Sequence, residues 1–127
     1  MYGYKKQAFG MFDDVVQKTR EELKKEGFGV LTEIDVKKTI KEKIGADYDN
    51  YVILGACNPP FAYKTLLAEK EIGLMLPCNV IVFEDKGNVF VSTILPTEAM
   101  KSVGNENLAD IAIAVENKLK KVVDSIS

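Results

Sequence analysis

The sequence predicts an α+β fold, specifically a two-layer sandwich with helices packed on one face of a mixed or antiparallel sheet. Strand-like and helix-like apolar spacings follow one another in the order β-α-β-α-β-α-β-β-α. One connection is a short hairpin whereas the others contain helices, and this mixture is typical of α+β domains. At 127 residues, the chain is expected to form a single domain, residues 1–127, around one core.

The first half of the chain alternates strands and helices. The segment at residues 2–9 is short, and its apolar and polar residues partly alternate, which predicts an edge strand. Helical spacing of apolar residues begins at Phe12. Gly27 suits the position just after that helix, and Asp35 suits the cap of the next one. The strand between them is expected to place alternating residues on one face: Phe28, Val30, Thr32 and Ile34.

A continuous apolar run at residues 51–57 predicts a central strand. Asn58 is suited to cap the helix that follows, and Pro59 to its first position, where a missing N–H costs nothing. An apolar loop is expected at residues 72–77. The inward residues expected on the helix are Phe61, Ala62 and Leu66.

The last third begins with a hairpin. A turn at residues 85–88 is expected to join two strands, and residues 96–100 to form one helical turn. The final helix carries one apolar face from Leu108 to Ile126.

Composition and charge narrow the class of function. The net charge is −2 and Arg20 is the single arginine, so a nucleic-acid partner is not expected. No stretch reaches the roughly 18 apolar residues of a membrane span, so no membrane partner is expected. The N-terminus lacks the apolar region of a signal peptide, which predicts a cytoplasmic protein whose thiols are reduced.

The candidate site is a dipeptide that occurs twice. The only two cysteines are each followed by asparagine, in Cys57-Asn58 and Cys78-Asn79, and proline lies beside both pairs. The chain contains no histidine, so nucleophilic or redox chemistry would depend on these thiols, on carboxylates, on lysine or on tyrosine. The same cysteines are also consistent with a simpler role as small buried hydrophobic residues.

Cys57 is expected to lie just before the helix that begins at Pro59. The unpaired N–H groups and dipole of a helix start favour a thiolate, or a bound phosphate or carboxylate. Cys78 follows Pro77 at the start of a strand. The two cysteines share one edge of the sheet only if the loop at 72–77 carries the chain back along it, and the sequence leaves this open.

No metal and no cofactor are expected. The 20 residues between the two cysteines match no standard zinc spacing, and Cys-x-x-Cys is absent. A metal site would require carboxylates beside the thiols, and the candidates are Glu33, Asp35 and Glu84.

The sheet face opposite the helices is expected to be too apolar for free exposure, and this predicts a homodimer. The candidate outward residues are Leu31, Ile81, Phe83, Phe90 and Ile94.

Three motifs resemble one family, the bacterial and archaeal domain of unknown function 302. They are EGFGVLTEIDV at residues 26–36, ILGACNPP at 53–60 and IGLMLPCNV at 72–80. The resemblance implies an α+β fold grouped with TATA-binding-protein-like sheets, a dimer, and no assigned activity. The motif positions it carries over, taken here as ligand-binding candidates, are Gly55, Cys57, Asn58, Pro59, Pro77, Cys78 and Asn79.

The leading hypothesis is a dimeric small-ligand binding or sensing module with its pocket at the two Cys-Asn motifs. Its ligand would be a small anion or a thiol-reactive species. An alternative is a thiol-dependent enzyme or redox protein that uses Cys57 together with Cys78. A third hypothesis is a structural or interaction protein whose cysteines are buried and inert.

Overall fold

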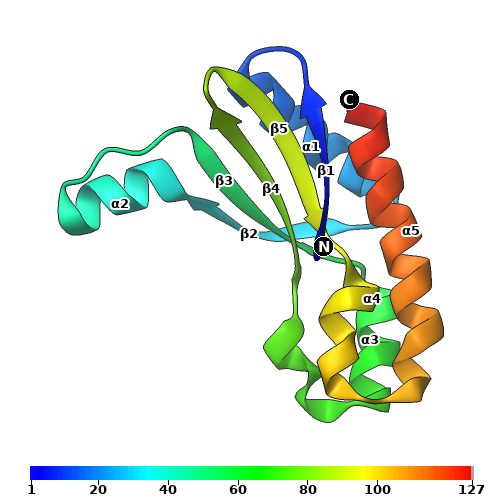
Figure 1. Ribbon diagram of the computed structural model, residues 1–127. Helices are drawn as coiled ribbons and strands as arrows, with labels where there is room; N and C mark the ends of the chain where they lie inside the picture. Colours follow the sequence, from blue (N-terminus) through cyan, green and yellow to red (C-terminus); the bar gives the residue numbers. More distant parts are fainter. Residues whose placement is uncertain (127) are drawn as a thin grey trace.

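The computed structural model describes residues 1–126, which form a five-stranded sheet with helices (Figure 1). The sheet order is β1-β5-β4-β3-β2, and every neighbouring pair is antiparallel. The predicted fold class and the predicted order of strands and main helices are confirmed. The strands are β1 Gly3–Ala8, β2 Gly29–Asp35, β3 Tyr51–Cys57, β4 Cys78–Asp85 and β5 Asn88–Ile94. The α-helices are α1 Phe12–Lys25, α2 Val36–Ile44, α3 Pro59–Ala68, α4 Pro96–Ala99 and α5 Ala109–Ile126.

The core lies between the sheet and the pair α1 and α5. Both helices pack against one face of the sheet and against each other (Figure 1). Alternate residues of the central strands face them, and Leu54, Val80 and Val82 are fully buried there. Leu23 of α1 and Leu119 of α5 meet this surface from the helix side, as their 3.6-residue apolar spacing requires. No helix within residues 1–126 is long and apolar enough to cross a bilayer.

The helices do not all lie on that face. α3, α4 and the first half of α5 extend beyond the end of the sheet, and α3 packs against α5 there (Figure 1). Three short 3₁₀ helices connect these elements, at Lys70–Met75, Met100–Val103 and Glu106–Leu108. The residues expected to form an apolar loop therefore include a 3₁₀ helix. The sheet end and this helical extension together enclose the candidate site.

Strand β2 departs from its predicted alternation. The register shifts between Val30, which pairs with Ala56, and Thr32, which pairs with Gly55. Leu31 is the extra residue of this β-bulge, and a bulge moves the following side chains to the other face. Val30 therefore lies on the helix-facing side, whereas Thr32 and Ile34 lie on the opposite side, and the single face predicted for these residues was wrong.

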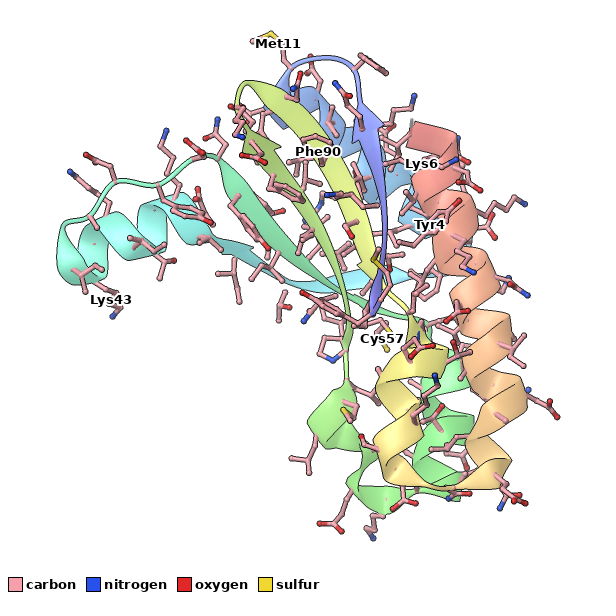
Figure 2. All side chains as sticks on the ribbon, viewed as in Figure 1. Tyr4, Lys6, Met11, Lys43, Cys57 and Phe90 are labelled. Atoms are coloured by element: carbon pink, nitrogen blue, oxygen red, sulfur yellow. The ribbon has the colours of Figure 1, made fainter. Side chains whose placement is uncertain are left out.

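The sheet face opposite α1 and α5 carries a row of aromatic side chains. Tyr51 stacks on Phe83 with ring centroids 5.5 Å apart, and Phe83 stacks on Phe90 at 5.4 Å. The ammonium group of Lys5 lies 5.3 Å from the Phe90 ring centroid, and Figure 2 shows Phe90 on this open side. These rings are only half buried. We call this surface, together with Ile34, Ile53, Ile81 and Ile94, the open face.

Helix α2 projects from the β2 edge and buries none of its residues (Figure 1). The Asp35 side chain accepts a hydrogen bond from the Lys38 N–H at 3.0 Å, so its predicted capping role is confirmed. Val36, Ile40 and Ile44 form an apolar stripe along this helix, and Ile44 is 76% exposed. Val36 and Ile40 are half-buried beside β2 and β3, so the stripe is uncovered only toward its Ile44 end.

Candidate functional site

The two cysteines meet at one edge of the sheet. Ala56 near the end of β3 pairs with Cys78 at the start of β4. Helix α3 extends beyond the end of the sheet (Figure 1), so this register requires the segment after α3 to return the chain to that same edge, which the sequence alone left open. Residues 70–77 do this with a 3₁₀ helix followed by Leu76 and Pro77, which are joined by a cis peptide bond.

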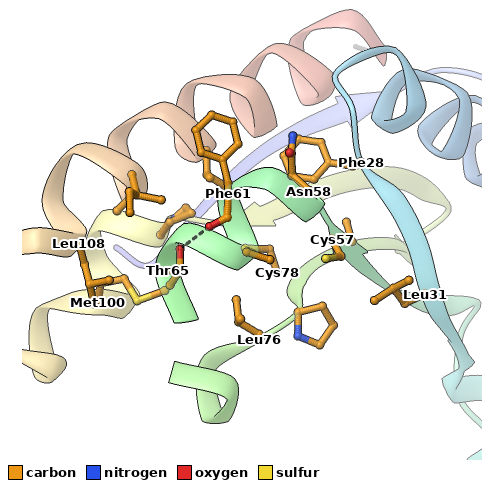
Figure 3. A pocket seen from close by; sticks show the side chains of 17 residues that line it. Phe28, Leu31, Cys57, Asn58, Phe61, Thr65, Leu76, Cys78, Met100 and Leu108 are labelled. Atoms are coloured by element: carbon orange, nitrogen blue, oxygen red, sulfur yellow. Dashed lines mark hydrogen bonds between the residues drawn. The ribbon is translucent and has the colours of Figure 1, made fainter. Parts of the chain in front are cut away.

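A pocket of about 230 Å³ lies where these strand ends meet α3, α4 and α5 (Figure 3). Its wall is almost entirely apolar. Phe61 and Thr65 line it from α3, and Met100 and Leu108 close the end away from the sheet (Figure 3). Leu31, the bulged residue of β2, lies at the opposite end and is 67% exposed.

Both thiols belong to the pocket wall, but they approach it differently. Since Ala56 and Cys78 are paired, their side chains share the helix-facing side of the sheet, and Cys57 alternates to the other side. Figure 3 shows Cys57 toward Leu31 and Cys78 nearer the middle, below Phe61. Both cysteines are free, and both are partly buried. The two thiols therefore reach the pocket wall from opposite sides of the sheet.

The thiol of Cys78 is partly buried and packs against the hydrophobic core. Burial raises its pKa from 9.0 to about 11, and the neighbouring Cys57 adds to this rise. Desolvation disfavours the charged thiolate, so Cys78 is held as a neutral thiol near pH 7. A neutral thiol is a weak nucleophile and a good apolar contact.

Asn58 occupies the predicted N-cap position of α3, but its side chain makes no capping hydrogen bond. Its Nδ2 instead donates to the backbone carbonyl of Glu26 at 3.3 Å, at the end of α1. Gly27 follows with a φ of +86°, and a Cβ there would lie 3.2 Å from Asn58 Nδ2. Asn58 thus joins the start of α3 to the α1–β2 turn, and the predicted side-chain cap was wrong.

The start of α3 offers few groups to an anion. Pro59 and Pro60 are its first two residues, so neither carries an N–H group. The Ala62 N–H is already bonded to the Asn58 carbonyl. Pro59 is where the sequence predicted it, yet the second proline removes a donor that an oxyanion site would use.

Gly55 explains how the chain packs behind the pocket. It is buried in β3 opposite Asn79, and Thr32 and Pro77 cover it from the open face. A Cβ at this position would overlap Thr32 Oγ1 and lie 2.8 Å from Pro77 Cγ. The absence of a side chain therefore allows Pro77 to lie against β3.

Not every predicted residue reaches the pocket. Cys57, Asn58, Pro77 and Cys78 line it, whereas Gly55 supports it from behind. The other candidates, Pro59 and Asn79, are exposed and lie outside its wall.

The predicted inward residues of α3 were partly wrong. Phe61 and Ala62 line the pocket as predicted, but Leu66 is 43% exposed and Thr65 is buried in its place. The sequence reasoning also missed Leu76, which directly precedes Pro77 within the third motif, and it missed Met100 and Ala112, which come from segments without a site motif. Their only signal was an apolar side chain beside the predicted elements.

The carboxylates considered as metal ligands are engaged elsewhere. Glu33 pairs with Arg20, Asp35 caps α2, and Glu84 accepts from the Asn50 amide at 2.9 Å. Within residues 1–126, no three side chains of the ligating types gather into a possible metal site.

The fold and the site define a small α+β domain with an apolar pocket at the ends of two strands. The chain belongs to the family described as Domain of unknown function DUF302, whose family model matches residues 4–126. A crystal structure of an uncharacterized conserved DUF302 protein from Bacillus stearothermophilus superposes with a TM-score of 0.95 and 28% identity. The match covers 100% of this chain and 99% of that one. None of the curated proteins matches the chain.

Proposed function

We propose that this protein is a small-ligand binding or sensing module that acts as a dimer in the cytoplasm. The observation that carries the proposal is the pocket of about 230 Å³ with both cysteines in its wall. Ligand sites are typically apolar concavities with a few reactive or polar groups in the wall, and this pocket has that composition. Two free thiols accord with a reducing compartment.

The thiols provide the test of this proposal. Iodoacetamide labelling of the folded protein, followed by peptide mass spectrometry, would measure the reaction rate of each cysteine separately. We expect Cys57 to react faster than Cys78, because Cys78 packs against the hydrophobic core and its burial raises its pKa. A molecule that fills the pocket should slow both reactions. If neither thiol reacts without denaturant, the pocket is closed to small molecules and the proposal fails.

The dimer is proposed to form through the open face. Half-buried aromatic and aliphatic side chains of this kind are typical of the centre of a protein–protein interface. A second copy is the proposed occupant because each chain supplies both an apolar sheet face and the projecting helix α2, whose apolar stripe ends in the exposed Ile44. A two-fold axis would let each α2 meet the open face of the other chain.

The variant Ile81→Asp tests the dimer, because Ile81 lies in the middle of the open face between Ile53 and Ser92. We expect the dimer Kd to rise by about 30-fold or more in sedimentation or light scattering. Ile113→Asp is the matched control, since Ile113 is 49% exposed on α5. A wild-type protein that is monomeric at micromolar concentration would contradict the proposed dimer.

A second candidate function is a thiol enzyme or redox protein, with Cys57 as the reacting thiol and Cys78 as its partner. This function is favoured by the presence of both free thiols in the wall of one pocket. This function predicts that a mild oxidant links the two cysteines within one chain and that Cys57→Ser prevents the link. If both thiols instead prove unreactive in the folded protein, a structural role for the cysteines is the better explanation.

A further inference from the structure

We propose that the ligand of the pocket is a neutral, apolar small molecule rather than an anion. This inference rests on the proposed function, since it assumes that the pocket holds a ligand. It follows from the chemistry of the wall, from the start of α3 and from the size of the space.

The wall offers a ligand no charge and few free polar groups. No lysine, arginine, aspartate or glutamate lines the pocket. The Asn58 amide N–H is used by the Glu26 carbonyl, and the Thr65 hydroxyl donates to the Phe61 carbonyl at 2.8 Å. What remains is aliphatic and aromatic surface, two thiols and the Asn58 side-chain oxygen, which accepts hydrogen bonds but would repel an anion. A ligand here gains by leaving water, and not by making directed polar contacts.

An anion would lose its hydration without replacement. A buried charge requires a partner or several hydrogen bonds, and the pocket supplies no basic side chain. The helix start that could have compensated begins with Pro59 and Pro60, which have no N–H to offer. The anionic ligand considered from the sequence therefore has the weaker support.

The pocket is partly open to solvent, so its size sets how much of a ligand it can bury. A dry apolar cavity of roughly 150 Å³ holds benzene, so in proportion a pocket of about 230 Å³ holds a molecule of about nine heavy atoms. Substituted benzenes and short branched hydrocarbons are in this range. Cumene and benzoate contain equal numbers of heavy atoms around the same ring, so they form a matched neutral and anionic pair of probes.

Methionine methyl groups provide a local readout. Met100 lies in the pocket wall, whereas Met11 precedes α1 and is 75% exposed (Figures 2 and 3). In protein labelled with ¹³C at the methionine methyls, we expect cumene to shift the Met100 signal in a saturable way and to leave Met11 unchanged. Benzoate and inorganic phosphate should leave both signals unchanged. The variant Met100→Leu assigns the signal.

A space-filling substitution tests the location. Ala112 of α5 is buried in the pocket wall, and Ala112→Leu should weaken cumene binding by about tenfold through lost room for ligand carbons. Ala109→Leu, on the exposed start of the same helix, should leave the affinity unchanged. Ala62→Leu, which fills the pocket from α3, replaces Ala112→Leu if that variant does not fold.

The possible results separate the two proposals. Saturable cumene binding that Ala112→Leu weakens and Ala109→Leu does not would support the apolar ligand. If benzoate or phosphate shifts Met100 and cumene does not, the ligand class is wrong while the binding function stands. If no probe shifts Met100, both proposals fail. A Met100 signal that moves with protein concentration alone would mean that a second chain occupies the pocket, and this would also overturn the inference.

Discussion

The substitution Gly55→Ala tests how the pocket is built. Gly55 is buried in β3, and a Cβ at this position would overlap Thr32 Oγ1 and approach Pro77 Cγ to 2.8 Å. Thr32 can rotate because it lies on the edge strand, but the proline ring is rigid and is fixed to the start of β4. The added methyl group should therefore displace Pro77 and, with it, the adjacent Cys78.

The magnitude follows from two opposing effects. Overpacking a core costs about 1–3 kcal/mol, and contact with a rigid ring places this site at the upper end. Replacing glycine by alanine in a strand returns about 0.5–1 kcal/mol of backbone entropy. The expected net loss in the free energy of unfolding is about 2 kcal/mol, or a fall in Tm of roughly 6–10 °C for a domain of this size.

Urea denaturation of three variants would check this reasoning. Gly29→Ala is the matched control, because nothing lies within 4 Å of a Cβ at Gly29 and its φ is not positive. Thr32→Ala combined with Gly55→Ala should recover only part of the loss, since the Pro77 contact remains. The close packing of Pro77 on β3 is refuted if Gly55→Ala is as stable as Gly29→Ala.

Two further predictions concern the cysteine motifs. The burial that raises the Cys78 pKa to about 11 means that the unfolded thiol ionises first as pH rises, so the unfolded state binds fewer protons. Stability should therefore fall between about pH 9 and pH 11, and less steeply in Cys78→Ala, as measured by denaturation at each pH. Asn58→Ala should cost about 1 kcal/mol because it removes the hydrogen bond to the Glu26 carbonyl. The matched variant Asn79→Ala, at the exposed asparagine, should cost almost nothing, and equal losses would show that the interhelix bond does not stabilise the fold.

Local sequence patterns were sufficient to predict the order of strands and helices, because the spacing of apolar residues within each element differs between the two. The long face from Leu108 to Ile126 and the capping Asp35 are examples, since both depend on neighbours within a few residues. The β-bulge at Leu31 could not be predicted, because an extra residue changes the facing of β2 without changing its composition.

The sequence predicted a pocket at the Cys-Asn motifs but not the α3 face or the far wall that complete it, for two physical reasons. Helix α3 is apolar on several sides, with Tyr63, Leu66 and Leu67 exposed, so its inward face could not be recognised from spacing. The far wall comes from Met100 and Ala112, whose positions depend on how α4 and α5 pack beyond the sheet. Packing between segments far apart in the chain leaves no local pattern in the sequence. The cysteine motifs, in contrast, marked the strand ends locally.

The two Cys-Asn motifs differ because β3 and β4 run in opposite directions. The chain leaves the sheet at Cys57, so Asn58 lies beyond the strand and reaches the end of α1. The chain enters the sheet at Cys78, so Asn79 lies within the strand opposite Gly55 and is exposed. The first dipeptide therefore provides a pocket thiol and a structural amide, whereas the second provides a thiol packed against the core and an amide on the surface. If the site uses its thiols, the two cysteines should not be interchangeable, and the environment of Cys78 favours contact with an apolar ligand over nucleophilic attack.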